Sequence, residues 1–132
     1  MGGAGAIRMA LRHPETFGAV VSVAGALFDQ ASIMERHWVS EAAVARHYDP
    51  YVLATQQAGR LRESLMLKIL IGTNDVWLDE NRRFRSRLDD LGIPCAYTEL
   101  DGLEHSTVQY LDAAGAEISE FYSAHLVGGL KQ

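Results

Sequence analysis

The chain has 132 residues and a formal net charge of −5, from 12 Lys and Arg against 17 Asp and Glu. This length fits one domain, and 48% hydrophobic with 22% charged residues are typical of a folded globular protein. The acidic balance argues against a nucleic-acid partner, and the single cysteine, Cys95, excludes an internal disulfide. No apolar stretch approaches the roughly 18 residues of a membrane-spanning helix, so we expect no membrane partner.

The first half of the chain predicts one buried helix, one strand and a group of short helices. Residues 4–13 are apolar except for a narrow polar stripe formed by Arg8 and Arg12, and this pattern is typical of a mostly buried helix. Residues 19–24 form a short, β-branched apolar run between two glycines, which predicts a strand buried on both faces. The following segment is helical in composition but is interrupted by Pro50, and it predicts short helices over residues 34–38, 41–47 and 51–60.

The second half predicts two further strands, each followed by a helix. The strands are expected over residues 67–71 and 95–100, and the helices over residues 79–91 and 113–126. Strands that alternate with helices favour right-handed crossovers and a parallel sheet. We therefore expect an α/β fold with about three parallel strands flanked by helices.

Two polar residues directly follow predicted strands and are the first candidates for a functional site. Asp75 follows the second strand and His105 follows the third. In open parallel sheets, ligands bind at the carboxyl ends of the strands, so both loops should meet at one edge. A carboxylate there can hold one imidazole nitrogen and leave the other free to accept a proton. The alternative is that both are ordinary polar loop residues.

Other patterns in the sequence predict no cofactor or metal site. Gly3-Ala4-Gly5 lacks the third glycine of a dinucleotide-binding loop, because Arg8 occupies that position, and no strand precedes it. The remaining histidines lie on predicted helices or at their ends without the spacing of metal ligands; they are His13, His37, His47 and His125.

Motifs along nearly the whole chain resemble those of the putative-esterase family of α/β-hydrolases. That family includes S-formylglutathione hydrolases, feruloyl and acetyl xylan esterases, and enterochelin esterases. The matching segments are Met1-Gly2-Gly3-Ala4-Gly5-Ala6 before the first helix, Arg12-His13-Pro14-Glu15-Thr16-Phe17 at its end, Val21-Ser22-Val23-Ala24-Gly25, Gly72-Thr73-Asn74-Asp75 and Gly102-Leu103-Glu104-His105-Ser106.

The resemblance implies roles for three residues of a Ser-His-Asp triad site. Asp75 matches the triad acid, His105 matches the triad base, and Met1 matches the residue whose backbone N–H forms half of the oxyanion hole. The nucleophilic serine would lie directly before Met1, and no Gly-x-Ser-x-Gly occurs within the chain. Residues 1–132 are therefore expected to be a single, partial α/β-hydrolase domain that lacks the N-terminal strands and the nucleophile. On that basis the chain as given is expected to be inactive.

The resemblance also implies a small ester or thioester as the substrate of the complete enzyme. Trp38 lies in the region that forms a cap in many hydrolases, and Trp77 follows the predicted acid by two residues. Both are candidate substrate-pocket residues, although packing within the core is an alternative role for each.

Two other interpretations remain open at this stage. The chain could be a non-catalytic α/β module or remnant that pairs with a partner chain, or an unrelated three-stranded binding domain. In the family the nucleophile-bearing strand lies beside the strand predicted over residues 19–24. Without it, that strand has an unpaired edge, which predicts a homodimer or a partner chain that covers the edge.

Overall fold

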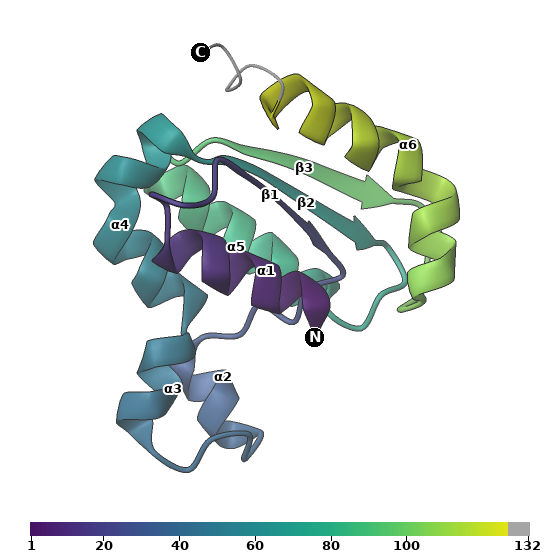
Figure 1. Ribbon diagram of the computed structural model, residues 1–132. Helices are drawn as coiled ribbons and strands as arrows, with labels where there is room; N and C mark the ends of the chain where they lie inside the picture. Colours follow the sequence, from purple (N-terminus) through teal and green to yellow (C-terminus); the bar gives the residue numbers. More distant parts are fainter. Residues whose placement is uncertain (127–132) are drawn as a thin grey trace.

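A computed structural model describes residues 1–126, and within them a parallel three-stranded sheet is flanked by helices on both faces (Figure 1). The fold is α/β, as predicted. In chain order, the elements are α1 (Gly2–Arg12), β1 (Ala19–Val23), α2 (Gln30–Glu35), α3 (Ala42–Tyr48), α4 (Pro50–Ser64), β2 (Met66–Gly72), α5 (Leu78–Asp90), β3 (Cys95–Leu100) and α6 (Thr107–Leu126).

The central strand β2 pairs in parallel with β1 on one side and β3 on the other. Leu67 is opposite Val20 of β1, and Ile69 is opposite Tyr97 of β3. Six of the seven β2 residues are buried, which agrees with a strand that is covered on both faces. Parallel pairing places the carboxyl ends of all three strands at the same edge of the sheet.

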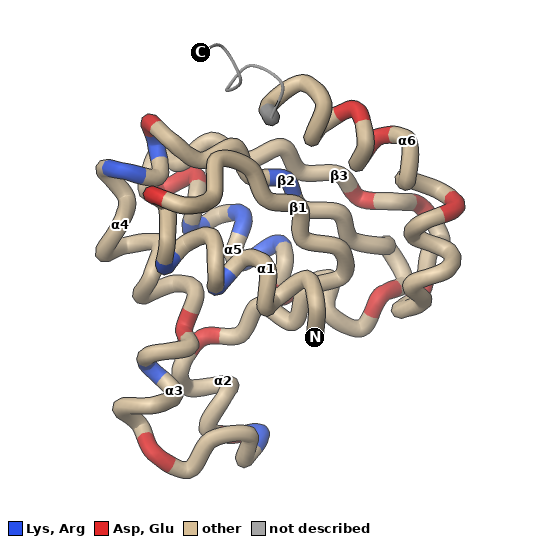
Figure 2. Tube along the Cα trace, viewed as in Figure 1, with Lys and Arg blue, Asp and Glu red and all other residues tan. Residues whose placement is uncertain are grey.

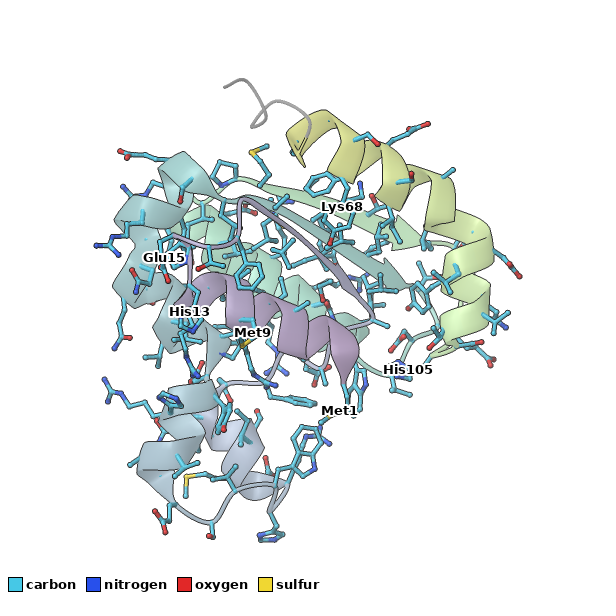
Figure 3. The ribbon with its side chains drawn as sticks, viewed as in Figure 1. Met1, Met9, His13, Glu15, Lys68 and His105 are labelled. Atoms are coloured by element: carbon cyan, nitrogen blue, oxygen red, sulfur yellow. The ribbon has the colours of Figure 1, made fainter. Side chains whose placement is uncertain are left out.

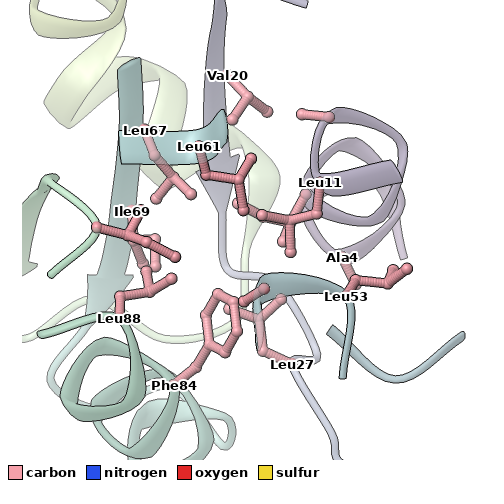
Figure 4. Packing of buried hydrophobic residues seen from close by; sticks show 14 of the residues in the cluster. Ala4, Leu11, Val20, Leu27, Leu53, Leu61, Leu67, Ile69, Phe84 and Leu88 are labelled. Atoms are coloured by element: carbon pink, nitrogen blue, oxygen red, sulfur yellow. The ribbon is translucent and has the colours of Figure 1, made fainter. Parts of the chain in front are cut away.

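Helices α1, α4 and α5 cover one face of the sheet and enclose the larger hydrophobic core (Figure 1). Figure 4 shows that the side chains of Leu11, Leu61 and Phe84 converge on Val20 and Ile69 of the sheet. Each fully buried leucine or isoleucine side chain contributes about 1.5–3 kcal/mol of transfer free energy. This packing holds the N-terminal end of α1 against the sheet edge where the candidate site lies.

Helix α6 covers the opposite face of the sheet and forms an ion pair with the central strand β2. Lys68 Nζ of β2 lies 2.5 Å from Glu117 Oε1, and the lysine side chain is only 9% exposed. The hydrogen bond from Lys68 holds the pKa of Glu117 below its usual value. Lys68 lies on the α6 side of the sheet, whereas most charged residues lie along the outer helices, including a mixed series on α5 (Figures 2 and 3).

Two of the predicted helices begin earlier than expected. The helix predicted over residues 34–38 is α2, which begins at Gln30 because the Asp29 carboxylate accepts the Ser32 N–H at 2.9 Å. The closing helix, predicted from residue 113, begins at Thr107. Its β-branched first residues are weak helix formers, but Tyr110 is fully buried and anchors this turn. Tertiary packing therefore decides where α6 begins.

Strand β1 lies at one edge of the described sheet. The backbone N–H of Val21 donates a hydrogen bond of 3.2 Å to the hydroxyl of Tyr122, on α6. The Tyr122 hydroxyl therefore satisfies one backbone N–H donor in the middle of β1. Among the described residues, every helix is too short or too polar to cross a membrane.

Candidate active site

The loop after β2 holds the buried carboxylate of Asp75. Gly72 ends the strand, and the Asp75 N–H donates to the Gly72 carbonyl at 3.1 Å to close a tight turn. Asp75 Oδ1 accepts the backbone N–H of Trp77 at 2.9 Å. The Asp75 side chain is 0% exposed, so its oxygen atoms depend on protein donors for hydrogen bonds.

His105, from the loop after β3, supplies a second contact to this carboxylate. Its Nδ1 lies 2.9 Å from Asp75 Oδ2, and its side chain is 45% exposed. Because a carboxylate only accepts, the neutral imidazole carries its proton on Nδ1 and leaves Nε2 as an acceptor. The structure thus brings the two predicted residues into direct contact, with the acid sealed from solvent and the base accessible.

Close contact between the two loops holds this geometry. A Cβ atom at Gly72 would lie 2.1 Å from the Leu103 carbonyl oxygen, so only glycine fits there. The Asn74 N–H donates to the Leu103 carbonyl at 3.1 Å, and the Gly102 N–H donates to Thr73 Oγ1 at 2.8 Å. The loops therefore form one hydrogen-bonded unit across the ends of β2 and β3.

Tyr110 is a member of this unit that the sequence analysis did not identify. Its hydroxyl donates to Asp75 Oδ2 at 2.7 Å and accepts the Gly72 N–H at 2.6 Å. Burial, together with the bond to Asp75, raises the pKa of Tyr110 well above its usual value, so the hydroxyl stays protonated as a donor. A buried tyrosine hydroxyl requires a partner, but residue 110 lies before the helix predicted over residues 113–126, and nothing in the sequence indicates its burial.

A cavity of about 280 Å³ opens beside His105, between the starts of α1 and α6. Met1 and His105 both line this cavity, and Figure 3 shows the two residues near each other. The start of α1 comes close to the end of β1 because Gly3 has no side chain, since a Cβ there would lie 2.4 Å from the Val23 carbonyl oxygen. The cavity is lined by Met1, Gly2, Gly3, Val23, Ala24, His105, Ser106, Thr107, Tyr110 and Leu111.

The two predicted pocket tryptophans belong to one aromatic cluster, but only one of them contacts the histidine. The Trp77 ring lies edge-on to His105 with 6.4 Å between centroids, and it contacts Phe28 at 5.0 Å. Trp38 packs on Phe28 at 5.2 Å and is 49% exposed. Trp77 therefore borders the Asp75–His105 pair, and Trp38 is separated from Trp77 by the Phe28 ring.

Residues 1–126 contain no group of three or more His, Cys, Asp or Glu side chains that could hold a metal ion. Burial raises the pKa of the Cys95 thiol to about 12, so this group is not a thiolate nucleophile at neutral pH.

Comparison with known protein families gives a match over most of the chain. The family model described as "Putative esterase" matches residues 1–114. The chain belongs to this esterase family. The matched region contains α1, all three strands and both loops that carry Asp75 and His105. A search among curated proteins finds no match.

Solved hydrolases share the fold of this esterase-family chain. An S-formylglutathione hydrolase from Staphylococcus aureus is 24% identical, with a TM-score of 0.69, and the match covers 92% of this chain and 47% of the hydrolase. A fluorophosphonate-binding serine hydrolase of the same organism is 22% identical, with a TM-score of 0.73, and the match covers 91% of this chain and 50% of that protein.

A ferulic acid esterase is similar as well, at 21% identity and a TM-score of 0.72, with 92% of this chain and 47% of that esterase covered. The chain therefore spans about half the length of the solved structures that it matches. The predicted family and the predicted α/β-hydrolase architecture are confirmed. The catalytic roles of Asp75, His105 and Met1 remain predictions.

Proposed function

We propose that Asp75 and His105 are the acid and the base of a serine-esterase triad that hydrolyses a carboxylic ester or thioester. The observation that carries this proposal is the 2.9 Å contact between His105 Nδ1 and the buried Asp75 Oδ2. In a triad the acid holds the imidazole in the tautomer whose Nε2 can accept a proton. The family membership supports esterase chemistry, and three similar folds are those of hydrolases.

The proposed reaction is acyl transfer through a covalent serine ester. A serine directly before Met1 would give its proton to His105 Nε2 as its oxygen attacks the substrate carbonyl carbon. His105 then protonates the leaving alcohol or thiol. In the second half-reaction it takes a proton from the water that attacks the acyl carbon, and it returns that proton to the serine oxygen as the acyl–serine bond breaks and the acid leaves. The Met1 N–H at the start of α1 is proposed to hold the oxyanion, where the positive end of the helix dipole favours negative charge.

The proposed serine lies outside the 132 residues, so the isolated chain is expected to be inactive. Loss of a triad serine lowers kcat by about a millionfold in a well-studied serine protease. The isolated chain should therefore hydrolyse p-nitrophenyl acetate at close to the buffer rate, and His105→Ala should leave that rate unchanged.

Sequencing the DNA before the Met1 codon, followed by expression of the whole reading frame, tests the proposal. An in-frame Gly-x-Ser should end directly before Met1, and the longer protein should hydrolyse p-nitrophenyl acetate. Substituting that serine, or His105→Ala, should lower kcat by about 10⁴–10⁶-fold. A frame without this serine, or a His105→Ala enzyme with full activity, would contradict the assignment.

A second candidate function is that of a module that pairs with another chain through the edge of β1. Strand β1 is one of the two edge strands of the described sheet, and the Tyr122 hydroxyl accepts a hydrogen bond from one of its outward N–H groups. An apolar parallel edge favours association with a further strand. We expect sedimentation of the isolated chain to give a homodimer or a larger assembly. A monomer that persists to about 100 μM would argue against this candidate, because stable dimers have dissociation constants well below that concentration.

A further inference from the structure

We propose that Arg36, together with the aromatic cluster of Phe28, Trp38 and Trp77, binds the carboxylate of an ester or thioester substrate beside His105. The inference deepens the proposed esterase function by naming a class of substrate, one with a negatively charged group.

The first observation is the position of the Arg36 guanidinium over three aromatic rings. Its central carbon lies 4.3 Å from the centroid of Phe28, 5.2 Å from that of Trp77 and 5.9 Å from that of Trp38. Phe28 is buried, and its ring contacts each of the two tryptophan rings edge-to-face. Three ring faces therefore fix the direction of a side chain that otherwise has many rotamers.

The second observation is that Arg36 makes no ion pair with a carboxylate among residues 1–126, in contrast to three arginines of α5. Arg82 pairs with Glu99, Arg83 with Glu80, and Arg85 with Asp89. A guanidinium stacked on aromatic rings keeps its N–H edge free for two parallel hydrogen bonds to a carboxylate. The exposed Arg36 guanidinium therefore has N–H donors available for an anionic ligand, and its position over the aromatic rings sets it apart from other exposed arginines.

The third observation is the continuity between this cluster and the candidate triad. The Trp77 ring contacts both the Arg36 guanidinium and the His105 ring. The Trp77 backbone N–H donates to the Asp75 carboxylate, and this hydrogen bond fixes the position of Trp77 relative to Asp75. A ligand whose carboxylate binds Arg36 would lie along Trp77 with its ester group toward His105.

A pair of esters with the same skeleton tests the charge requirement on the chain as it exists. Monomethyl glutarate carries one carboxylate, and dimethyl glutarate carries none. NMR titration of the indole N–H signals of Trp38 and Trp77 should show the monoester binding about tenfold more tightly, the effect of one charge-assisted hydrogen-bond pair. Arg36→Gln should reduce the affinity for the monoester to that for the diester, and Arg36→Lys should retain part of the preference.

Arg46→Gln serves as the matched control, because it removes an exposed cation of α3 in the same part of the fold. It should leave the preference for the monoester unchanged. Equal binding of both esters, no binding of either up to about 50 mM, or an unchanged preference in Arg36→Gln would overturn the inference. The esterase proposal fails separately, through the His105 activity test. If the chain prefers the monoester but the longer protein lacks esterase activity, Arg36 is an anion-binding site and the esterase proposal fails. If the longer protein is an active esterase but shows no preference for the monoester, only the proposed role of Arg36 fails.

Discussion

Substitution of Gly72 by alanine is expected to destabilise the protein by about 3 kcal/mol or more, the upper end of the cost of overpacking. The new Cβ would lie 2.1 Å from the Leu103 carbonyl oxygen, and backbone atoms on both sides of this contact leave no flexible group to move away. The Leu103 carbonyl must shift, and its 3.1 Å hydrogen bond from Asn74 is then lost. Because these loops carry Asp75 and His105, the substitution should also separate the two side chains.

Gly59→Ala is the matched control for this prediction. Gly59 lies inside α4, and nothing lies within 4 Å of a Cβ built there. Alanine is favoured over glycine in a helix interior by about 0.5–1 kcal/mol, so this variant should be slightly more stable than the parent. Urea denaturation of the three proteins measures the difference. A Gly72→Ala protein as stable as the parent would show that the two loops are not in contact.

Tyr110→Phe is expected to lower the free energy of unfolding by about 2–4 kcal/mol, since each buried polar group left without a partner costs about 1–3 kcal/mol. The phenyl ring keeps the packing of the fully buried side chain. The lost hydroxyl leaves the Gly72 N–H without its acceptor and Asp75 Oδ2 without one of its donors. We also expect the imidazole of His105 to become less well ordered, because Tyr110 positions the carboxylate that holds it.

Tyr97→Phe is the corresponding control, since its hydroxyl donates to Glu99 at 3.1 Å in a partly exposed position. Water can replace that bond, so its removal should change stability by no more than about 0.5 kcal/mol. Denaturation curves of both variants give the comparison. If the two substitutions had the same small effect, Tyr110 would have no special part in holding the acid.

The features that the sequence predicted correctly depend on local patterns. The β-branched runs predicted the strands, and their alternation with helices predicted a parallel sheet. Asp75 and His105 each follow a strand, so this pattern placed them at one edge of the sheet, where the structure has them. The family motifs were recognisable because each is a short contiguous segment next to an element boundary.

The features that the sequence did not reveal depend on contacts between distant segments. Tyr110 lies 35 residues from Asp75, and neither residue carries a local signal that they share a hydrogen bond. The same holds for Arg36, whose contact with Trp77 forms only when the segment after α2 folds back onto the acid loop. The early start of α6 was missed because Thr107 and Val108 have weak helix propensity, which tertiary packing outweighs.

The protonation of the two ring nitrogens of His105 tests the central claim most directly. Long-range ¹H–¹⁵N NMR spectra of the chain, at a pH where this ring is neutral, report which nitrogen carries the proton. The contact with Asp75 predicts the proton on Nδ1, with Nε2 free to accept one from a nucleophile. Asp75→Asn should remove this preference, because an amide can donate to Nδ1. A neutral ring with its proton on Nε2 in the parent protein would contradict the assignment of Asp75 and His105 as the acid and base of an esterase triad.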